Sequence, residues 1–183
     1  MNGQLSPRAR EILEAARKLL ESEGPGALRM RKVAERIGIR APSLYKHFSS
    51  KQALEAAMIS HGFEEQAALF EAALTDSPQP IVAMAEAYRE FALVHPHLYR
   101  LMYDSSLDRS LLNPGSEDRA AAPVIEAMGG DRDLARAAFA FAHGMTILEL
   151  NHRFPAGADL DAAWRRGLAG LQASFRATGM EDD

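Results

Sequence analysis

The sequence has no cysteine, no long apolar run and few β-branched residues. The lack of cysteine excludes disulfide bonds and metal sites built on thiolates. No apolar stretch reaches the roughly 20 residues of a membrane-spanning helix, and the N-terminus lacks the apolar centre of a signal peptide. Gly-rich phosphate loops and Ser-His-Asp or His-Glu patterns at a useful spacing are also missing. These absences favour a cytoplasmic protein that is not an enzyme, has no cofactor and does not associate with membranes.

The chain of 183 residues is 47% hydrophobic, which is enough for one large or two small domains with a buried core. Its net charge of −4 is unevenly distributed. Residues 1–60 carry eleven Lys or Arg against six Asp or Glu, whereas residues 61–183 carry ten against nineteen. This asymmetry favours a polyanion-binding module joined to an acidic body with another role. Chance clustering of solvated charges explains it equally well.

Ala, Leu, Glu and Arg dominate the chain, so the sequence predicts an all-α fold of about nine helices. Ser49, with Gln52 three residues later, has the spacing of a capping box for a fourth helix over about 50–74. The remaining predictions are a loop over 107–120, a short helix over 123–128, and two long amphipathic helices over 131–153 and 159–176, capped by Asp131 and Asp159.

Two short helices, predicted over 30–37 and 41–48 on either side of Gly38, have the size and spacing of a helix-turn-helix. Leu44 and Phe48 are four residues apart and are expected to face inward. The rest of the second helix is rich in groups that can contact base edges or phosphates: Pro42, Ser43, Tyr45, Lys46 and His47. A solvated polar face on a three-helix core is the alternative interpretation.

Residues 10–54 resemble the DNA-binding domain of the tetracycline-repressor (TetR) family of bacterial transcription regulators, with the spacing of that domain throughout. The matching residues are Ile12, Leu13, Ala16, Val33, Ala34, Gly38, Ile39, Leu44, Tyr45, His47, Phe48, Lys51 and Leu54. The resemblance implies a three-helix DNA-binding domain over 1–54, linked by the fourth helix to a helical-bundle ligand-binding and dimerisation domain over 55–183. It also implies DNA contacts from Ala41, Pro42, Ser43, Tyr45, Lys46 and His47, and a phosphate contact from Lys51.

Arg29 and Arg40 depart from the family, which often places Ser or Thr at the N-caps of the second and third helices. Arginine offers no oxygen to accept a hydrogen bond from a helix N-terminus. We expect DNA phosphates to satisfy the open N–H groups, with both arginines adding charge to the DNA-binding surface.

The segment 139–150 resembles a C-terminal subtype of the family named for a Trp-His-Gly triplet, of which only His143 and Gly144 match. Gly144 in mid-helix predicts a close crossing by another helix or a ligand. The family resemblance implies a pocket for a hydrophobic or aromatic effector, with candidates Tyr88, Phe91, Met102, Tyr103, Phe139 and His143. For each of these residues, plain core packing is the alternative. His95 and His97 lack further ligands at helical spacing, so no metal site is predicted.

The last two long helices carry apolar stripes that are rich for one small core. Since an operator-reading helix-turn-helix usually works as a pair, we expect a homodimer through residues 131–153 and 159–176, with contacts from Met145, Leu148, Leu168 and Leu171. Core packing within one chain is the alternative for both stripes. Together with these patterns, the family resemblance implies a repressor that binds a palindromic DNA operator as a dimer and is released by a small effector. A helical interaction adaptor with a purely structural helix-turn-helix is the alternative.

Overall fold

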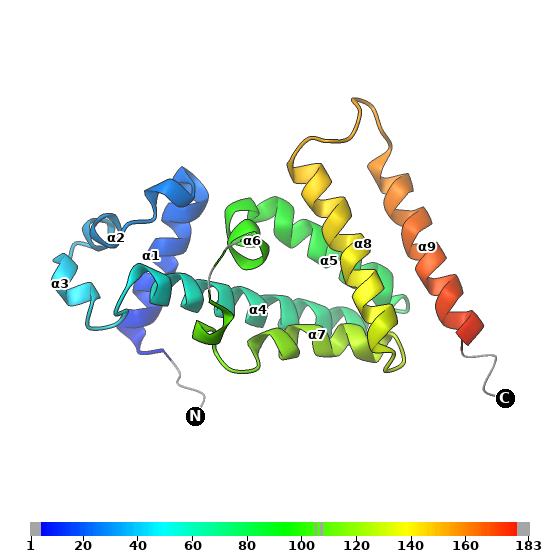
Figure 1. The fold of residues 1–183 in the computed structure, drawn as a ribbon, viewed down its shortest axis with the longest axis horizontal. Coiled ribbons are helices and arrows are strands. Elements are labelled where there is room, and N and C mark those ends of the chain that lie inside the picture. The colour runs from blue at the N-terminus through cyan, green and yellow to red at the C-terminus, as the bar shows by residue number, and fades with distance from the viewer. Residues whose placement is uncertain (1–4, 105, 107, 179–183) are drawn as a thin grey trace. The chain divides into compact units, whose positions relative to one another are not determined.

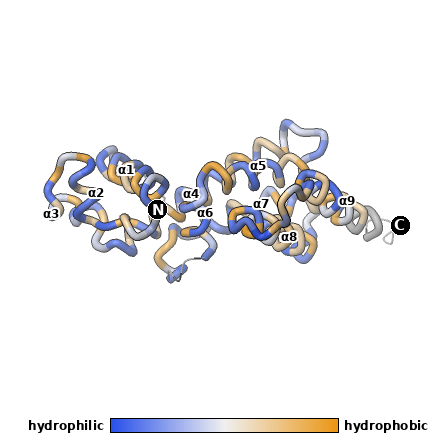
Figure 2. Tube along the Cα trace, turned by 90° about the horizontal axis from the view of Figure 1, so that it is seen from above, coloured by the Kyte–Doolittle hydropathy of each residue, from blue (hydrophilic) through white to orange (hydrophobic). Residues whose placement is uncertain are grey.

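The computed structural model describes residues 5–104, 106 and 108–178, and every regular element in these residues is a helix. Nine α-helices and two short 3-10 helices follow one another along this part of the chain (Figure 1), which confirms the predicted all-α fold. Hydrophobic and hydrophilic residues are interspersed along the helices (Figure 2), as expected where a helix buries one face. Within the same residues, no helix combines the length and the apolar character that crossing a bilayer requires.

The chain divides into two compact units, each made of two stretches of sequence. The first contains Met1–Phe63 and His95–Ser116, and the second contains Glu64–Val94 and Glu117–Asp183. Helix α4 (Lys51–Asp76) runs through the boundary between them. The units do not follow the predicted division at residue 54, because the segment 95–116 groups with the N-terminal helices.

The first unit is built around a three-helix core followed by the start of α4. Its elements are α1 (Pro7–Glu23), the 3-10 helix η1 (Pro25–Ala27), α2 (Met30–Arg36), α3 (Ala41–Leu44), the first half of α4, α6 (Pro96–Tyr103) and the 3-10 helix η2 (Arg109–Leu111). The hydroxyl of Ser6 caps α1 by accepting a hydrogen bond from the N–H of Ala9 at 3.2 Å. The apolar positions predicted from periodicity are buried, among them Ile12, Ala16, Leu19, Leu20, Val33, Ala34 and Leu54.

Two boundaries in this unit differ from the prediction. Helix α3 ends at Leu44 instead of residue 48, although the N–H of Phe48 still donates to the carbonyl of Leu44 at 3.1 Å. The cap of α4 is Ser50, whose hydroxyl accepts a hydrogen bond from the N–H of Ala53 at 3.0 Å. The predicted capping box at Ser49 was therefore wrong by one residue.

Helix α6 is held at both ends by charged side chains of the first unit. His95 occupies its N-cap position but contributes no side-chain hydrogen bond there. Instead, the carboxylate of Glu21 on α1 accepts hydrogen bonds from two N–H groups of the first turn, at 3.2 and 2.8 Å. At the other end, Arg109 Nη2 donates to the carbonyl of Met102 at 2.8 Å. A carboxylate at the N-terminus and a guanidinium at the C-terminus both complement the helix dipole, so these contacts tie α6 to α1 and η2.

We expect Glu21→Ala to lower the free energy of unfolding by about 1–2 kcal/mol, because two helix N–H groups lose their acceptor. Glu21→Gln keeps one acceptor oxygen without the charge, so its expected loss is smaller. Urea unfolding followed by far-UV circular dichroism measures both variants. Glu14→Ala is the control, since Glu14 lies on the exposed side of the same helix and pairs only with Lys18. Equal losses for Glu21→Ala and Glu14→Ala would contradict the role of Glu21.

The second unit is an assembly of five helical segments. These are residues 64–76 of α4, α5 (Pro80–Val94), α7 (Ser116–Ala127), α8 (Arg132–Leu150) and α9 (Leu160–Thr178). Asp131 and Asp159 cap α8 and α9 as predicted, and the carboxylate of each accepts a hydrogen bond of 2.9 Å from a backbone N–H group. Part of the core is formed by Met128, Ala135 and Ala138, with Leu171 of α9 packed against them.

Helix α7 corrects the prediction of a loop over 107–120 and a short helix over 123–128. The helix starts at Ser116, and Glu117 and Asp118 fall in its first turn, where carboxylates are favoured by the helix dipole. Pro123 lies inside the helix instead of near its start. The polar composition that indicated a loop belongs in fact to an exposed first turn.

In the second unit, a close helix contact is found at Gly167 and not at Gly144. A Cβ atom at Gly167 of α9 would lie 2.1 Å from Cζ of Phe141 on α8, so only glycine fits there without movement of the ring. A Cβ atom at Gly144 would have no described atom of another element within 4 Å. The predicted close crossing at Gly144 is therefore absent from the described part of the chain.

Candidate DNA-binding and effector-binding sites

The polar surface of the helix-turn-helix lies around α3. Leu44 and Phe48 are 0% and 5% exposed and anchor this segment in the core, as predicted. The side chains of Pro42, Ser43, Tyr45, Lys46 and His47 are all exposed, and Ala41 is half-buried. Tyr45 is 49% exposed although it is a large aromatic residue. The segment therefore presents a hydroxyl, an ammonium, an imidazole and a phenol beside an apolar proline, the groups that base edges and phosphates require.

Arg29 and Arg40 occupy the N-cap positions of α2 and α3, and neither makes a side-chain capping hydrogen bond, as predicted. At α3 the missing cap leaves few open donors. Pro42 has no N–H, and the N–H of Ser43 donates to the carbonyl of Arg40 at 2.9 Å. Both arginines are exposed, and neither forms an ion pair with a residue that the structure describes. Their charges are therefore available to a polyanion.

Lys51 begins α4 but is engaged in an ion pair. Its Nζ lies 3.0 Å from Oε1 of Glu55, one turn further along the helix. The carboxylate is mostly buried, with 16% of the Glu55 side chain exposed, whereas the Lys51 side chain is 48% exposed. A phosphate at the N-terminus of α4 would therefore compete with Glu55 for the ammonium, and its own charge would be repelled by that carboxylate.

We expect Lys51 and Glu55 to affect DNA affinity in opposite directions. Lys51→Gln removes a phosphate contact and should weaken binding by about 3- to 10-fold at moderate salt. Glu55→Gln releases Lys51 and removes a negative charge near the phosphate, so it should strengthen binding by about 2- to 5-fold. Fluorescence anisotropy with a duplex that the parent binds measures both effects. Weaker binding by Glu55→Gln would contradict the competition.

In the second unit, four rings from α4, α5 and α8 pack together around Tyr88. Tyr88 lies between Phe70 and Phe139, with ring centroids at 6.3 and 6.1 Å. Phe139 stacks on His143 at 5.7 Å with an angle of 18° between the planes. The Tyr88 hydroxyl is 3.3 Å from His143 Nδ1. We call Phe70, Tyr88, Phe139 and His143 the aromatic cluster. It offers ring faces and one hydrogen-bonded polar pair, and it reaches the surface at Phe139, which is 44% exposed.

The six predicted effector residues fall in both units. Three of them, Tyr88, Phe139 and His143, lie together in the aromatic cluster, and Phe91 is buried further along α5. Met102 and Tyr103 lie on α6 in the first unit. Met102 is fully buried and faces Gly62, where a Cβ would lie 2.6 Å from its Sδ. Tyr103 packs edge-on against Phe63 at 5.8 Å. Phe70 was missed, because an aromatic residue on a long amphipathic helix indicates core.

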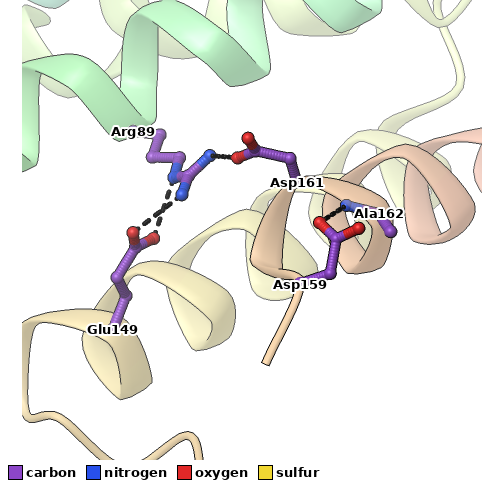
Figure 3. Close-up of polar contacts among 5 residues, drawn as sticks. All are labelled: Arg89, Glu149, Asp159, Asp161 and Ala162. Carbon is purple, nitrogen blue, oxygen red and sulfur yellow. Dashed lines mark hydrogen bonds and ion pairs between the residues drawn. The ribbon is translucent and has the colours of Figure 1, made fainter. Parts of the chain in front are cut away.

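A network of three charged side chains, which the sequence did not reveal, joins α5, α8 and α9 (Figure 3). Arg89 of α5 donates through Nε and Nη2 to the two carboxylate oxygens of Glu149 at 2.8 and 2.7 Å. Its Nη1 donates to Asp161 Oδ1 at 2.7 Å (Figure 3). The guanidinium also lies over the ring of Trp164, 5.7 Å from its centroid. All three hydrogen bonds are charge-assisted, and the Glu149 pair is bidentate.

The network shifts the pKa values of Arg89 and Asp161. The hydrogen bond to Glu149 is the main cause that raises the pKa of Arg89 above its ordinary range. The hydrogen bond from Arg89 and its positive charge lower the pKa of Asp161. Since the pKa of Asp161 is lowered in the folded state, its contribution to stability is present above the ordinary aspartate pKa of about 4 and is lost as the pH falls through the lowered value. The Arg89–Asp161 ion pair therefore contributes to stability at neutral pH.

The residues predicted at the dimer interface have different surroundings. Leu148 is 42% exposed and Met145 is half-buried on α8, whereas Leu168 is 5% exposed and Leu171 packs on the core of its own unit. On α8, the small residues Ala137 and Ala140 are exposed, and Gly144, one turn before Leu148, is half-buried. On α9, Ala163, Gly170 and Ala173 are likewise small and exposed. No group of three His, Asp or Glu side chains that could hold a metal ion occurs in the described residues.

Comparison with known proteins connects both halves of the chain to one family. A family model described as bacterial regulatory proteins, tetR family, matches residues 12–58. A second model, described as the tetracyclin repressor-like C-terminal domain, matches residues 81–171. The first match contains the helix-turn-helix, and the second contains Arg89 and His143.

Individual relatives agree with this result. The tetracycline repressor protein class A from transposon 1721 of Escherichia coli is 30% identical over 152 residues, 82% of this chain and 64% of the relative. The HTH-type transcriptional activator FasR of Mycolicibacterium smegmatis is 32% identical over 101 residues, 54% of this chain and 46% of the relative. The chain thus spans only 46 to 64% of the length of these relatives. A TetR variant from Acinetobacter baumannii AYE, solved in complex with minocycline, shares the fold with a TM-score of 0.67, at 22% identity over 96% of this chain and 98% of that one.

Proposed function

This chain belongs to the TetR family of bacterial regulatory proteins, and from that premise we propose that it is a ligand-responsive transcription regulator. It binds a palindromic DNA operator as a homodimer, through the exposed residues around α3. A small hydrophobic or aromatic effector binds the second unit and releases the DNA, so the protein acts as a repressor in the bacterial cytoplasm. The observation that carries the proposal is the polar surface of α3, where five exposed side chains surround two buried anchors.

The basic N-terminal segment supports DNA as the partner. Arg29 and Arg40 are exposed at the N-caps of α2 and α3, and Lys46 is exposed just after α3. None of the three is neutralised by a described carboxylate. Phosphate contacts from such residues make affinity fall steeply with salt, since binding releases condensed counterions. The purely structural helix-turn-helix of an adaptor would leave these charges without a role.

The aromatic cluster supports an aromatic effector. A planar ring can stack on Phe139, and the Tyr88–His143 pair can exchange its internal hydrogen bond for one to a polar group of the effector. The guanidinium of Arg89, which lies next to Tyr88 in sequence, is already paired with two carboxylates, which favours an uncharged molecule over an anion. Binding that favours one conformation of the dimer would lower the population that fits the operator.

The exposed small residues of α8 and α9 support a dimer face. A Cβ atom at Gly144 or Gly170 would meet no described atom of another element within 4 Å, and Leu148, one turn after Gly144 on α8, is exposed. Small residues let two helices approach closely, whereas glycine inside an isolated helix costs about 1 kcal/mol relative to alanine. We therefore place the dimer face on Gly144, Met145, Leu148 and Gly170, while Leu168 and Leu171 serve the core of their own unit.

Selection from a pool of random-sequence duplexes tests the proposal. The full chain should enrich an inverted repeat whose half-sites lie about one helical turn apart, because a two-fold dimer presents two copies of α3. Binding to the enriched duplex should weaken by at least about 10-fold between 50 and 200 mM salt. A pool without any enriched inverted repeat would favour the interaction adaptor.

A further inference from the structure

The ion pairs of Arg89 join three helices, and its partners flank a single connection. Glu149 lies in the last turn of α8 and Asp161 in the first turn of α9, so the two carboxylates stand at the two ends of the segment 151–159 (Figure 3). Asp159, two residues before Asp161, is used separately as the cap of α9 through the N–H of Ala162 (Figure 3). One guanidinium on α5 therefore fixes both arms of the α8–α9 hairpin.

The charge of Glu149 makes this attachment dependent on Arg89. A carboxylate near a helix C-terminus is unfavourable, because the open carbonyl groups there carry partial negative charge. Only 15% of the Glu149 side chain is exposed, so water solvates its negative charge poorly. The bidentate bond from Arg89 satisfies both of its oxygens and sets the rotation of α8 about its own axis.

Arg89 is also the neighbour of Tyr88, the centre of the aromatic cluster. Tyr88 contacts α8 at His143, and Arg89 contacts it at Glu149, six residues further on. At 1.5 Å per residue these two points are about 9 Å apart along α8. A movement of α5 at Tyr88 is therefore transmitted to α8 and α9 through the adjacent residue.

We infer that Arg89 is a positioning residue that holds the α8–α9 hairpin at a fixed angle to α5 and thereby sets the distance between the two reading helices of the dimer. This inference rests on the proposed function, because it requires a dimer formed by α8 and α9. Arg89 touches neither DNA nor effector in this role. It determines which operator half-site spacing the dimer accepts and carries a shift of α5 to the dimer face.

The test compares the half-site spacing that the parent and three variants select from a random-sequence duplex pool. Arg89→Lys keeps the positive charge but loses the bidentate hydrogen bond to Glu149, and Arg89→Met removes both. Asp161→Asn weakens only the contact between Arg89 and α9. All variants should enrich the half-site sequence of the parent, because α3 is unchanged. The preference for the parental spacing over a spacing one base pair longer should fall by at least about fivefold in Arg89→Met and Asp161→Asn, and less in Arg89→Lys.

Arg136→Met is the matched control, because Arg136 pairs with Asp133 within α8 and ties no helices together. It should keep the parental spacing. Asp161 is 68% exposed, so Asp161→Asn tests the inference even if Arg89→Met fails to fold. If Asp161→Asn and Arg89→Lys prefer the parental half-site spacing as strongly as the parent does, the inference is overturned. The proposed function stands in that case. Failure of the parent itself to enrich an inverted repeat would contradict the proposed function instead.

Discussion

Lys46→Ala is expected to abolish specific operator binding while leaving the fold unchanged. Lys46 is exposed beside α3 and makes no ion pair with the described residues, so its removal costs no internal contact. Loss of one base or phosphate contact costs about 1–3 kcal/mol, and a dimer loses the contact twice. Affinity should therefore fall at least about 30-fold, as measured by fluorescence anisotropy at fixed salt. Tyr45→Ala, on the same surface, should show a loss of the same kind.

Arg132→Ala controls for the loss of one positive charge, because Arg132 is exposed in the first turn of α8, far along the sequence from α3. Its affinity should remain within about twofold of the parent. Circular dichroism and the urea midpoint should be unchanged in all three variants. If Lys46→Ala and Tyr45→Ala bind the operator as well as the parent, the reading surface lies elsewhere and the assignment of α3 is incorrect.

Gly144→Leu should convert the dimer into a monomer although it improves the helix. Leucine favours helix over glycine by almost 1 kcal/mol, and a Cβ at this position meets no described atom of another element within 4 Å. The isolated chain should therefore tolerate or gain from the change. A helix of the partner that packs closely on Gly144 would instead be pushed away. With bivalency lost, operator affinity should fall by roughly 100-fold or more.

Sedimentation velocity measures the association state directly, and Ala121→Leu on the exposed side of α7 is the control for added apolar surface. Gly170→Leu should behave like Gly144→Leu, because its position on α9 is equally open. A Gly144→Leu protein that remains a dimer with parental operator affinity would remove Gly144 from the interface.

The helix-turn-helix could be predicted because its determinants are local in sequence. Leu44 and Phe48 are one turn apart, Gly38 adopts the positive φ of 68° that the tight turn needs, and the missing caps at Arg29 and Arg40 can be read from residue type. The errors in this region are small shifts. Ser50 caps α4, although only Ser49 has a glutamine three residues later, as a capping box requires.

Contacts between distant segments could not be predicted in this way. Glu21 accepts a hydrogen bond from the N–H of His97, which is 76 residues away in the sequence. Arg89 is 60 residues from Glu149. Neither carboxylate has a local pattern that separates it from a solvated surface charge. The apolar stripes of α8 and α9 raised a related difficulty, because periodicity identifies a buried face without showing whether the same chain or a partner covers it. Leu168 proved to be internal, while the open positions are the glycines.

Hydrogen–deuterium exchange of the full chain, with and without its selected duplex, tests most directly whether the helix-turn-helix reads DNA. Arg29 and Arg40 leave α2 and α3 without side-chain caps, so phosphates and base contacts should slow exchange in the segment 29–51. We expect strong protection there with the selected duplex and much weaker protection with a scrambled duplex at the same salt concentration. Equal exchange in this segment with and without the selected duplex would contradict DNA reading by α3.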